Sequence, residues 1–186
     1  MAKKIRKDLL EEIEIPEGID ATIENNIIVM KKDDKELKRK IDLEIELKKQ
    51  DNKIIASVKK ARKNEKKKFG TSVSHIRNMI IGLDNGWEYE LEICNVHFPM
   101  NVTYDKEKKE VSIKNLLGEK SPRVLKVSGE VEIDIKAPKI ILKSYDKELA
   151  GQTATNLEKA SRVRNRDRNK FQDGIFITKK PGKTYI

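Results

Sequence analysis

The chain repeats one order of elements, and this repetition constrains its fold more than any other feature. In each half, two short apolar runs precede an alternating segment, and a stripe of apolar residues at helical spacing follows. Matching landmarks keep a nearly constant offset: Pro99 follows Pro16 by 83 residues, and Leu157 follows Ile76 by 81. A near-constant offset across several landmarks indicates an internal duplication. We therefore predict two tandem repeats instead of one large core.

Two periodicities occur within the first repeat. Residues 41–47 alternate apolar and polar side chains, which is the period of a strand with one polar face. Residues 73–83 carry apolar side chains at helical spacing, and Thr71 or Ser72 can cap such a helix. The Asn-Asn pair at 25–26 lies between two apolar runs and indicates a tight hairpin. We predict an α+β fold in which each repeat is a small antiparallel β-sheet covered by one α-helix.

The second repeat has the same order of elements. Residues 127–135 alternate in the manner of a strand, and residues 149–160 form a helical stripe that Asp146 can cap. An Asn-Gly pair at 85–86 ends the first helix and places the boundary between the repeats. The predicted domains are an N-terminal repeat, residues 1–85, and a C-terminal repeat with a basic arm, residues 86–186.

Positive charge is concentrated near the C-terminus. Residues 155–186 contain nine basic and three acidic residues, so this window contributes +6 of the chain's formal net charge of +10. In an extended backbone, side chains at every second position lie on one side, where they can meet a row of phosphates. Such alternating positions form what we call the basic ladder: Arg162, Arg164, Arg166, Arg168 and Lys170.

Charge segregation narrows the class of partner. A second basic block, Lys53–Lys68, holds eight basic residues and one Glu, so the rest of the chain is mildly acidic. Basic blocks on an acidic body indicate a polyanion, nucleic acid first and an anionic membrane second. For the Lys53–Lys68 block itself, an RNA contact and a solvated face both remain open. Aromatic residues are only 5% of the chain, which favours folded RNA recognised by shape and backbone.

Membrane association and catalysis are the weaker alternatives. No apolar run approaches the roughly 20 residues of a membrane span, and the N-terminus lacks the apolar core of a signal peptide, so we expect a cytoplasmic protein with no membrane partner. Cys94 and His97 form a Cys-x-x-His pair, but a structural zinc site takes four ligands. An enzyme using His75, His97 or Cys94 would need a paired base, and the sequence supplies none. We predict no catalytic residue, metal or cofactor. Binding to duplex DNA is also disfavoured, because the sequence has no recognition-helix signature.

Five strings resemble the universal large-subunit ribosomal protein family L-six in its archaeal and eukaryotic form. They are TSVSHIRNMIIG (71–82), VHFPM (96–100), LGEKSPR (117–123), DKELAGQTATNLE (146–158) and FQDGIFI (171–177). They span both repeats in order, so the resemblance covers nearly the whole chain. It implies two sheet-and-helix repeats and a structural ribonucleoprotein role in translation. It also implies binding to large-subunit rRNA, mainly by the C-terminal repeat, near the sarcin-ricin loop where translational GTPases dock.

The resemblance and the charge pattern together give the predicted rRNA-binding residues. By position, the resemblance implies contacts from Lys120, Ser121 and Arg123, from Gly151, Gln152 and Asn156, and from the basic ladder. Charge alone adds Lys159, Lys179, Lys180 and Lys183. The implied partners are large-subunit rRNA and neighbouring large-subunit proteins, with translational GTPases passing nearby.

Two local expectations concern how the basic arm and its helix are built. Gly151 either lets an RNA backbone approach the helix or allows close packing of the helix on the sheet. Phe171, Ile175 and Ile177 are predicted to anchor the arm to the sheet, which makes the basic ladder a tethered loop. Residues from Lys179 onward are predicted to be the free end.

Overall fold

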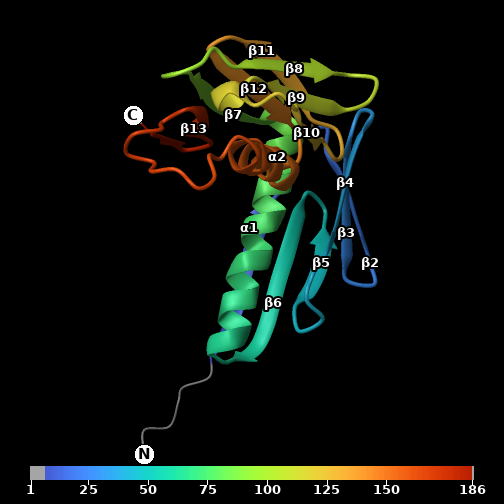
Figure 1. Ribbon diagram of the computed structural model, residues 1–186. Helices are drawn as coiled ribbons and strands as arrows, with labels where there is room; N and C mark the ends of the chain where they lie inside the picture. The colour runs from blue at the N-terminus through green and yellow to red at the C-terminus, as the bar shows by residue number, and fades with distance from the viewer. Residues whose placement is uncertain (1–6, 186) are drawn as a thin grey trace, which may run out of the picture. The chain divides into compact units, whose positions relative to one another are not determined.

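The computed structural model describes residues 7–185 and divides the chain into two compact units, Met1–Asn85 and Gly86–Ile186 (Figure 1). Each unit combines antiparallel strands with one α-helix among the described residues. This arrangement confirms the predicted α+β fold of two repeats. The strands of each unit divide further into two sheets. Within residues 7–185, no helix is long and apolar enough to cross a membrane.

The first unit contains two three-stranded antiparallel sheets and helix α1 (Lys63–Asn85). One sheet has the order β1-β6-β5, with β1 at Lys7–Glu14, β6 at Lys53–Ala61 and β5 at Glu46–Gln50. The other has the order β2-β3-β4, with β2 at Asp20–Glu24, β3 at Ile27–Lys32 and β4 at Lys35–Lys40. Helix α1 packs on β1, β3 and β6, so it contacts both sheets. Ile28, Ile54 and Ile76 are fully buried in this core.

The Asn-Asn hairpin is confirmed, but the strand prediction at 41–47 is wrong. The predicted strand at 41–47 is mostly a turn in which Leu43 is 80% exposed while Ile41 and Ile45 are buried. Two charged segments for which the sequence analysis predicts no strand, Lys7–Glu14 and Lys35–Lys40, form β1 and β4. Both are edge strands, whose polar side chains hide the alternation that marks a half-buried strand.

Helix α1 also begins earlier than predicted. The Arg62 N–H donates to the Glu65 carboxylate at 2.9 Å, which satisfies a backbone donor that the helix itself leaves unpaired. The first turns of α1 are therefore made from the end of the basic block. Gly82 lies inside the helix, which ends at the predicted Asn85.

The second unit contains a three-stranded and a five-stranded antiparallel sheet. The smaller has the order β10-β9-β8, with β10 at Arg123–Lys126, β9 at Glu110–Lys114 and β8 at Asn101–Asp105. The larger has the order β11-β12-β7-β13-β14, with β11 at Glu132–Lys136, β12 at Lys139–Ser144, β7 at Trp87–Cys94, β13 at Gly174–Lys180 and β14 at Lys183–Thr184. A short 3-10 turn spans Leu116–Gly118.

Helix α2 (Lys147–Ala160) packs on β7, β10, β12 and β13 (Figure 1). As predicted, Asp146 caps it, accepting a hydrogen bond from the Glu148 N–H at 2.8 Å. The predicted stripe of Leu149, Thr153, Leu157 and Ala160 faces the core. Thr153 and Leu157 are buried, Leu149 and Ala160 are partly buried, and Ala150 and Ala154 beside them are completely buried. The small alanines let α2 lie close to the sheet, and its opposite face is left to solvent.

Two predictions in the second unit are wrong. Val127 and Val131 are buried, but they lie in the loop before β11, which begins only at Glu132. The predicted free end from Lys179 onward is a hairpin: β13 pairs with β14, and the Tyr185 N–H donates to the Thr178 carbonyl. The turn between the strands uses Gly182 at φ 79°, a conformation that glycine adopts easily.

Candidate nucleic-acid interface

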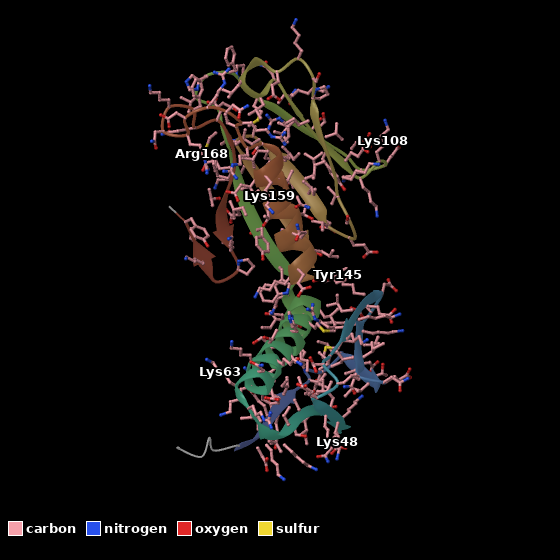
Figure 2. All side chains as sticks on the ribbon, turned by 60° about the horizontal axis from the view of Figure 1, so that its bottom comes forward. Lys48, Lys63, Lys108, Tyr145, Lys159 and Arg168 are labelled. Atoms are coloured by element: carbon pink, nitrogen blue, oxygen red, sulfur yellow. The ribbon has the colours of Figure 1, made fainter. Side chains whose placement is uncertain are left out.

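The basic ladder lies in a loop between α2 and β13, which we call the basic loop (residues 162–173). The loop contains no strand, Asn165 is left-handed at φ 56°, and the Lys170 and Phe171 N–H groups both donate to the Asp167 carbonyl. The predicted extended geometry is therefore wrong, because this turn and the bend at Asn165 interrupt it. All five ladder side chains are exposed. Figure 2 shows Lys159 on α2 beside the loop that carries Arg168.

Asp173 fixes the C-terminal end of the basic loop. Its side chain is 2% exposed, and one carboxylate oxygen accepts from the Val96 and His97 N–H groups, each at 2.9 Å. The other oxygen lies 2.6 Å from His97 Nδ1. Burial alone would raise the pKa of Asp173, but the hydrogen bonds from His97 and Val96 outweigh it and hold the pKa below its ordinary value. An ionised carboxylate thus ties the loop to the segment that follows β7.

Aromatic contacts fix the middle of the loop. Phe171 stacks on His97, with ring centroids 4.9 Å apart, and the Arg166 guanidinium lies 4.8 Å from the centroid of Phe171. Ile175, at the start of β13, is fully buried and pairs with Ile93 of β7. The predicted anchoring to the sheet is confirmed for Ile175, and Ile177 is half-buried on the same strand, whereas Phe171 contacts His97 in the segment that follows β7.

Arg123 fixes the N-terminal end of the loop. Its guanidinium donates to both carboxylate oxygens of Glu119, and to the carbonyls of Ala160 and Arg162 at 2.8 and 2.9 Å. The hydrogen bonds from Arg123 to Glu119 hold the pKa of the Glu119 carboxyl below its ordinary value. Because the last carbonyls of a helix lack partners within the helix, Arg123 completes the end of α2. Its position favours a role in placing the loop over a direct contact with phosphate.

Ion pairing separates the cations of this chain into two groups. Lys179 lies 2.6 Å from a Glu90 oxygen and 3.7 Å from a Glu88 oxygen, and Lys143 pairs with Glu88 at 3.4 Å. In the part of the chain that the structure describes, many other cations have no carboxylate within 4.0 Å. On α2 and the basic loop these unpaired cations are Lys159, Arg162, Arg164, Arg166, Arg168 and Lys170. They can meet an anion without first breaking an ion pair.

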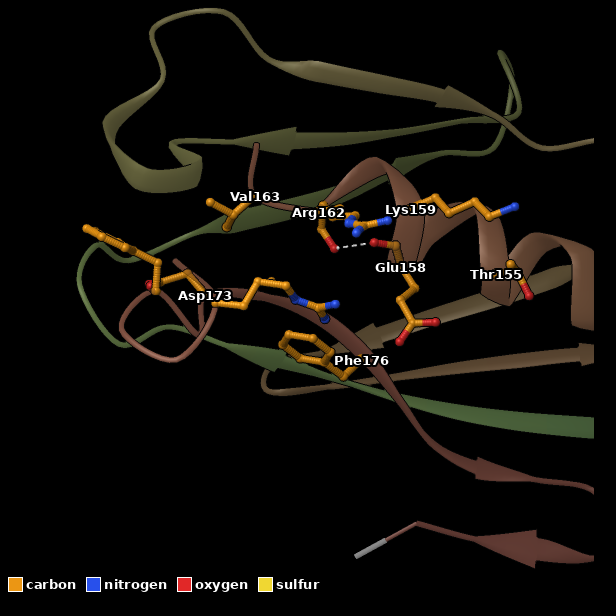
Figure 3. A pocket seen from close by; sticks show the side chains of 11 residues that line it. Thr155, Glu158, Lys159, Arg162, Val163, Asp173 and Phe176 are labelled. Atoms are coloured by element: carbon orange, nitrogen blue, oxygen red, sulfur yellow. Dashed lines mark hydrogen bonds between the residues drawn. The ribbon is translucent and has the colours of Figure 1, made fainter. Parts of the chain in front are cut away.

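A cavity of about 300 Å³ opens between the C-terminal half of α2, the basic loop and the start of β13 (Figure 3). Two aromatic rings, Phe171 and Phe176, line it together with Glu158. Three of the unpaired cations also line it: Lys159, Arg162 and Arg168. The chemistry of this surface is therefore cationic and aromatic, with two carboxylates, Glu158 and Asp173, in the lining.

Comparison with known proteins identifies the family of this chain. The family model described as "Ribosomal protein L6" matches residues 15–86 and 98–174. The chain belongs to the ribosomal protein L6 family. It is similar to the "Large ribosomal subunit protein uL6" of Methanococcus vannielii, at 41% identity over 93% of this chain and 94% of the relative. The proteins of the same name from Sulfurisphaera tokodaii (41% identity, 92% of each chain) and Methanobrevibacter smithii (39% identity, 91% of this chain and 95% of the relative) are comparably similar.

The remaining predicted residues of this L6-family chain fall into three places. Lys120 and Ser121 are exposed in the turn before β10. Gln152 and Asn156 lie one turn apart on α2, and the Gln152 amide donates to Asn156 Oδ1 at 2.8 Å. In the terminal hairpin, Lys179 is ion-paired, while Lys180 and Lys183 flank the Tyr185 ring at 5.1 and 4.8 Å. The structure thus brings the helix and loop residues together and leaves the hairpin lysines as a separate group.

The sequence analysis did not predict which residues hold the basic loop in place. These residues are Asp173, His97 and Glu119. The string FQDG places Asp173 before an apolar run, which is the only local signal. Its partner His97 lies 76 residues away in the sequence, and only the antiparallel pairing of β7 with β13 brings the two together.

Residues considered for catalysis have structural partners in the L6 fold. His75 Nε2 lies 3.1 Å from an Arg39 nitrogen, and His97 is held by Asp173. Burial, with help from the charges of Glu92 and Asp173, raises the pKa of the Cys94 thiol, which keeps it protonated and a weak nucleophile. Among the described residues, no group of three or more His, Cys, Asp or Glu side chains is arranged to hold a metal ion.

The Lys53–Lys68 block is divided by its ion pairs. Lys53 pairs with Glu12 and Glu14, and Lys68 pairs with Asp42 and Glu44 at 3.1 Å each. The basic side chains between them are exposed at the end of β6 and in the first turn of α1. An RNA contact by this block therefore remains a hypothesis that rests on its middle part.

Substitution of Gly151 distinguishes its two predicted roles. A Cβ at this position would lie 2.9 Å from Tyr89 Oη, so Gly151→Ala is expected to lower the free energy of unfolding by about 1 to 2 kcal/mol through overpacking. Thermal unfolding of the full chain measures this. Tyr89→Phe in the Gly151→Ala background removes the contacting oxygen and should recover part of the loss. An unchanged melting temperature for Gly151→Ala would instead point to RNA approach as the reason for the glycine.

Proposed function

We propose that this chain is a structural, non-enzymatic component of the large ribosomal subunit, working in the cytoplasm and binding large-subunit rRNA mainly through its C-terminal repeat. Membership of the ribosomal protein L6 family and the names of its relatives support the ribosomal role. The observation that carries rRNA binding is the set of unpaired cations on α2 and the basic loop. A cation without a protein partner binds phosphate at a lower cost than one already held in an ion pair.

Placement of these cations on a supported loop favours binding to a defined RNA shape. Arg123 holds one end of the basic loop, and Asp173 holds the other. Arginine offers planar pairs of donors that match phosphate oxygens, so a loop fixed at both ends presents those donors in a limited set of directions. Gln152 and Asn156 add neutral hydrogen-bonding groups suited to ribose hydroxyls on the adjacent face of α2.

Salt dependence tests the electrostatic basis of this function. If about six phosphates are neutralised, raising salt from 50 to 200 mM should weaken rRNA binding roughly a thousandfold, because bound cations displace counterions from RNA. Filter binding of the full chain to large-subunit rRNA across this range gives the slope. A flat response to salt would contradict binding through the basic loop.

We also propose where the protein lies within the ribosome, on the basis of the family resemblance. We place the C-terminal repeat near the sarcin-ricin loop, beside the docking region of translational GTPases and against neighbouring large-subunit proteins. Hydroxyl-radical footprinting of rRNA with and without the protein tests this location. The protected riboses should include that loop and its flanking helices, and the protein should sediment with the large subunit in cell extract. Protection confined to other regions would show that this placement is wrong.

A further inference from the structure

We propose that the cavity between α2, the basic loop and β13 binds one unpaired guanine nucleotide of the rRNA. This inference rests on the proposed rRNA binding and adds a base-specific site to it. In the cavity lining, Phe171 and Phe176 supply aromatic surface, Glu158 supplies a carboxylate, and cations surround them.

The size and the aromatic lining suit a single base. A volume of about 300 Å³ is at the lower end of ligand cavities, which commonly span roughly 300 to 1,000 Å³. Sequence-specific contacts to RNA are made with bases that have left the stack, and aromatic side chains receive such bases on their faces. Phe171 already stacks on His97, and the Arg166 guanidinium lies over its ring, so the ring is held in place. Phe176 is half-buried, and the ring remains in contact with the cavity.

Glu158 indicates which base is bound. Figure 3 shows its side chain extending toward Phe176, and within the described residues its carboxylate has no hydrogen bond or ion pair. A carboxylate repels phosphate, so in an RNA-binding cavity it is favourable only where the RNA presents hydrogen-bond donors. Guanine is the one RNA base with two adjacent N–H donors on its Watson–Crick edge, N1–H and N2–H, which match the two oxygens of a carboxylate.

The other carboxylate in the lining does not compete for this role. Both oxygens of Asp173 are occupied by His97 and Val96, so Glu158 is the carboxylate left for a ligand. Lys159 directly follows Glu158 in the sequence, Arg162 follows it by four residues, and Arg168 lines the cavity from the loop. These cations can hold the nucleotide's phosphate while the base enters. Further unpaired cations outside the cavity, Arg164 and Arg166, continue the surface along an RNA chain and favour a nucleotide within RNA over a free one.

Kethoxal, which reacts with N1 and N2 of unpaired guanine, provides the test. The full chain bound to large-subunit rRNA should protect one unpaired guanine, and Phe176→Leu, which keeps an apolar side chain but removes the stacking face, should lose that protection and weaken binding about tenfold. Glu158→Leu, which removes both acceptor oxygens and keeps a side chain of similar size, should lose the same protection. Phe98→Leu alters an aromatic side chain that is 49% exposed outside the cavity and should leave the protection unchanged.

The outcomes separate this site from the proposed function. Ribose protection without any guanine protection that depends on Phe176 and Glu158 would overturn the guanine site and leave rRNA binding intact. Absence of any binding to rRNA would overturn both. Titration calorimetry with guanosine 5′-monophosphate alone should give no saturable heat at micromolar concentration. Tight binding of the free nucleotide would assign the cavity to a small molecule and overturn the inference.

Discussion

Alanine at Arg162, Arg164, Arg166 and Arg168 together is expected to weaken binding to large-subunit rRNA by on the order of a hundred- to thousandfold at 0.15 M salt. The four guanidinium groups are exposed and have no ion-pair partner among the described residues. Their loss removes up to four phosphate contacts, so the slope of log affinity against log salt should fall by about three to four. Filter binding over a salt series measures both quantities.

A control variant separates local contact from net charge. Lys31, Lys38, Lys136 and Lys143 are ion-paired with Glu36, Glu36, Asp134 and Glu88, and replacing all four by alanine changes the net charge by the same amount. This control should bind rRNA within a few-fold of the unchanged protein. Circular dichroism and melting of the arginine variant should remain near those of the parent. Loss of its fold, or equal weakening by the control, would contradict the proposed interface.

Asp173→Ala is expected to lower the free energy of unfolding of the second unit by about 2 to 3 kcal/mol. The change leaves the Val96 and His97 N–H groups without their acceptor and releases the His97 ring. Because this carboxylate fixes one end of the basic loop, rRNA binding should weaken as well, although no cation is removed. Thermal unfolding and rRNA binding by the same protein sample test the two effects together.

The stabilisation that Asp173 provides depends on pH, because its carboxyl group must be ionised. Hydrogen bonding holds the pKa of the folded state below the ordinary value of 3.8, so the stabilisation is complete above that value and is lost as the pH falls through the lower, folded-state pKa. Asp173→Asn keeps an oxygen for the two N–H groups but cannot ionise. It should therefore be milder than alanine at neutral pH and should reduce the acid sensitivity of the second unit. Equal acid sensitivity in Asp173→Asn and the parent would contradict this role.

Much of the fold follows from local pattern. The Asn-Asn hairpin, the Asp146 cap and the buried stripe of α2 were all predictable, because each depends on residues a few positions apart. Edge strands were not: β1 and β4 carry mostly charged side chains, and only their hydrogen bonds to β6 and β3 identify them as strands. The segment at 41–47 shows the opposite error, since its alternation comes from a turn that buries Ile41 and Ile45.

The candidate site was predictable in its charge but not in its organisation. A run of alternating basic residues indicates an anionic partner in any backbone, and the basic loop keeps that property although it is not extended. The role of Arg123 could not be predicted from the sequence. By sequence it is one more cation for rRNA, but in the fold its guanidinium is used by Glu119 and by two carbonyls at the end of α2.

For this protein, the order of residues alone establishes the duplication, the α+β class and a basic surface in the C-terminal repeat, because these properties depend on periodicity and net charge. The tertiary structure decides which cations lack a carboxylate. Lys179 is neutralised by Glu88 and Glu90 across a pair of strands, whereas the basic loop meets no such partner. The tertiary structure also places Glu158 beside Phe176 and so creates a cavity with aromatic, cationic and acidic walls. Both outcomes depend on contacts between residues far apart in the chain, which only the folded backbone brings within a few ångströms.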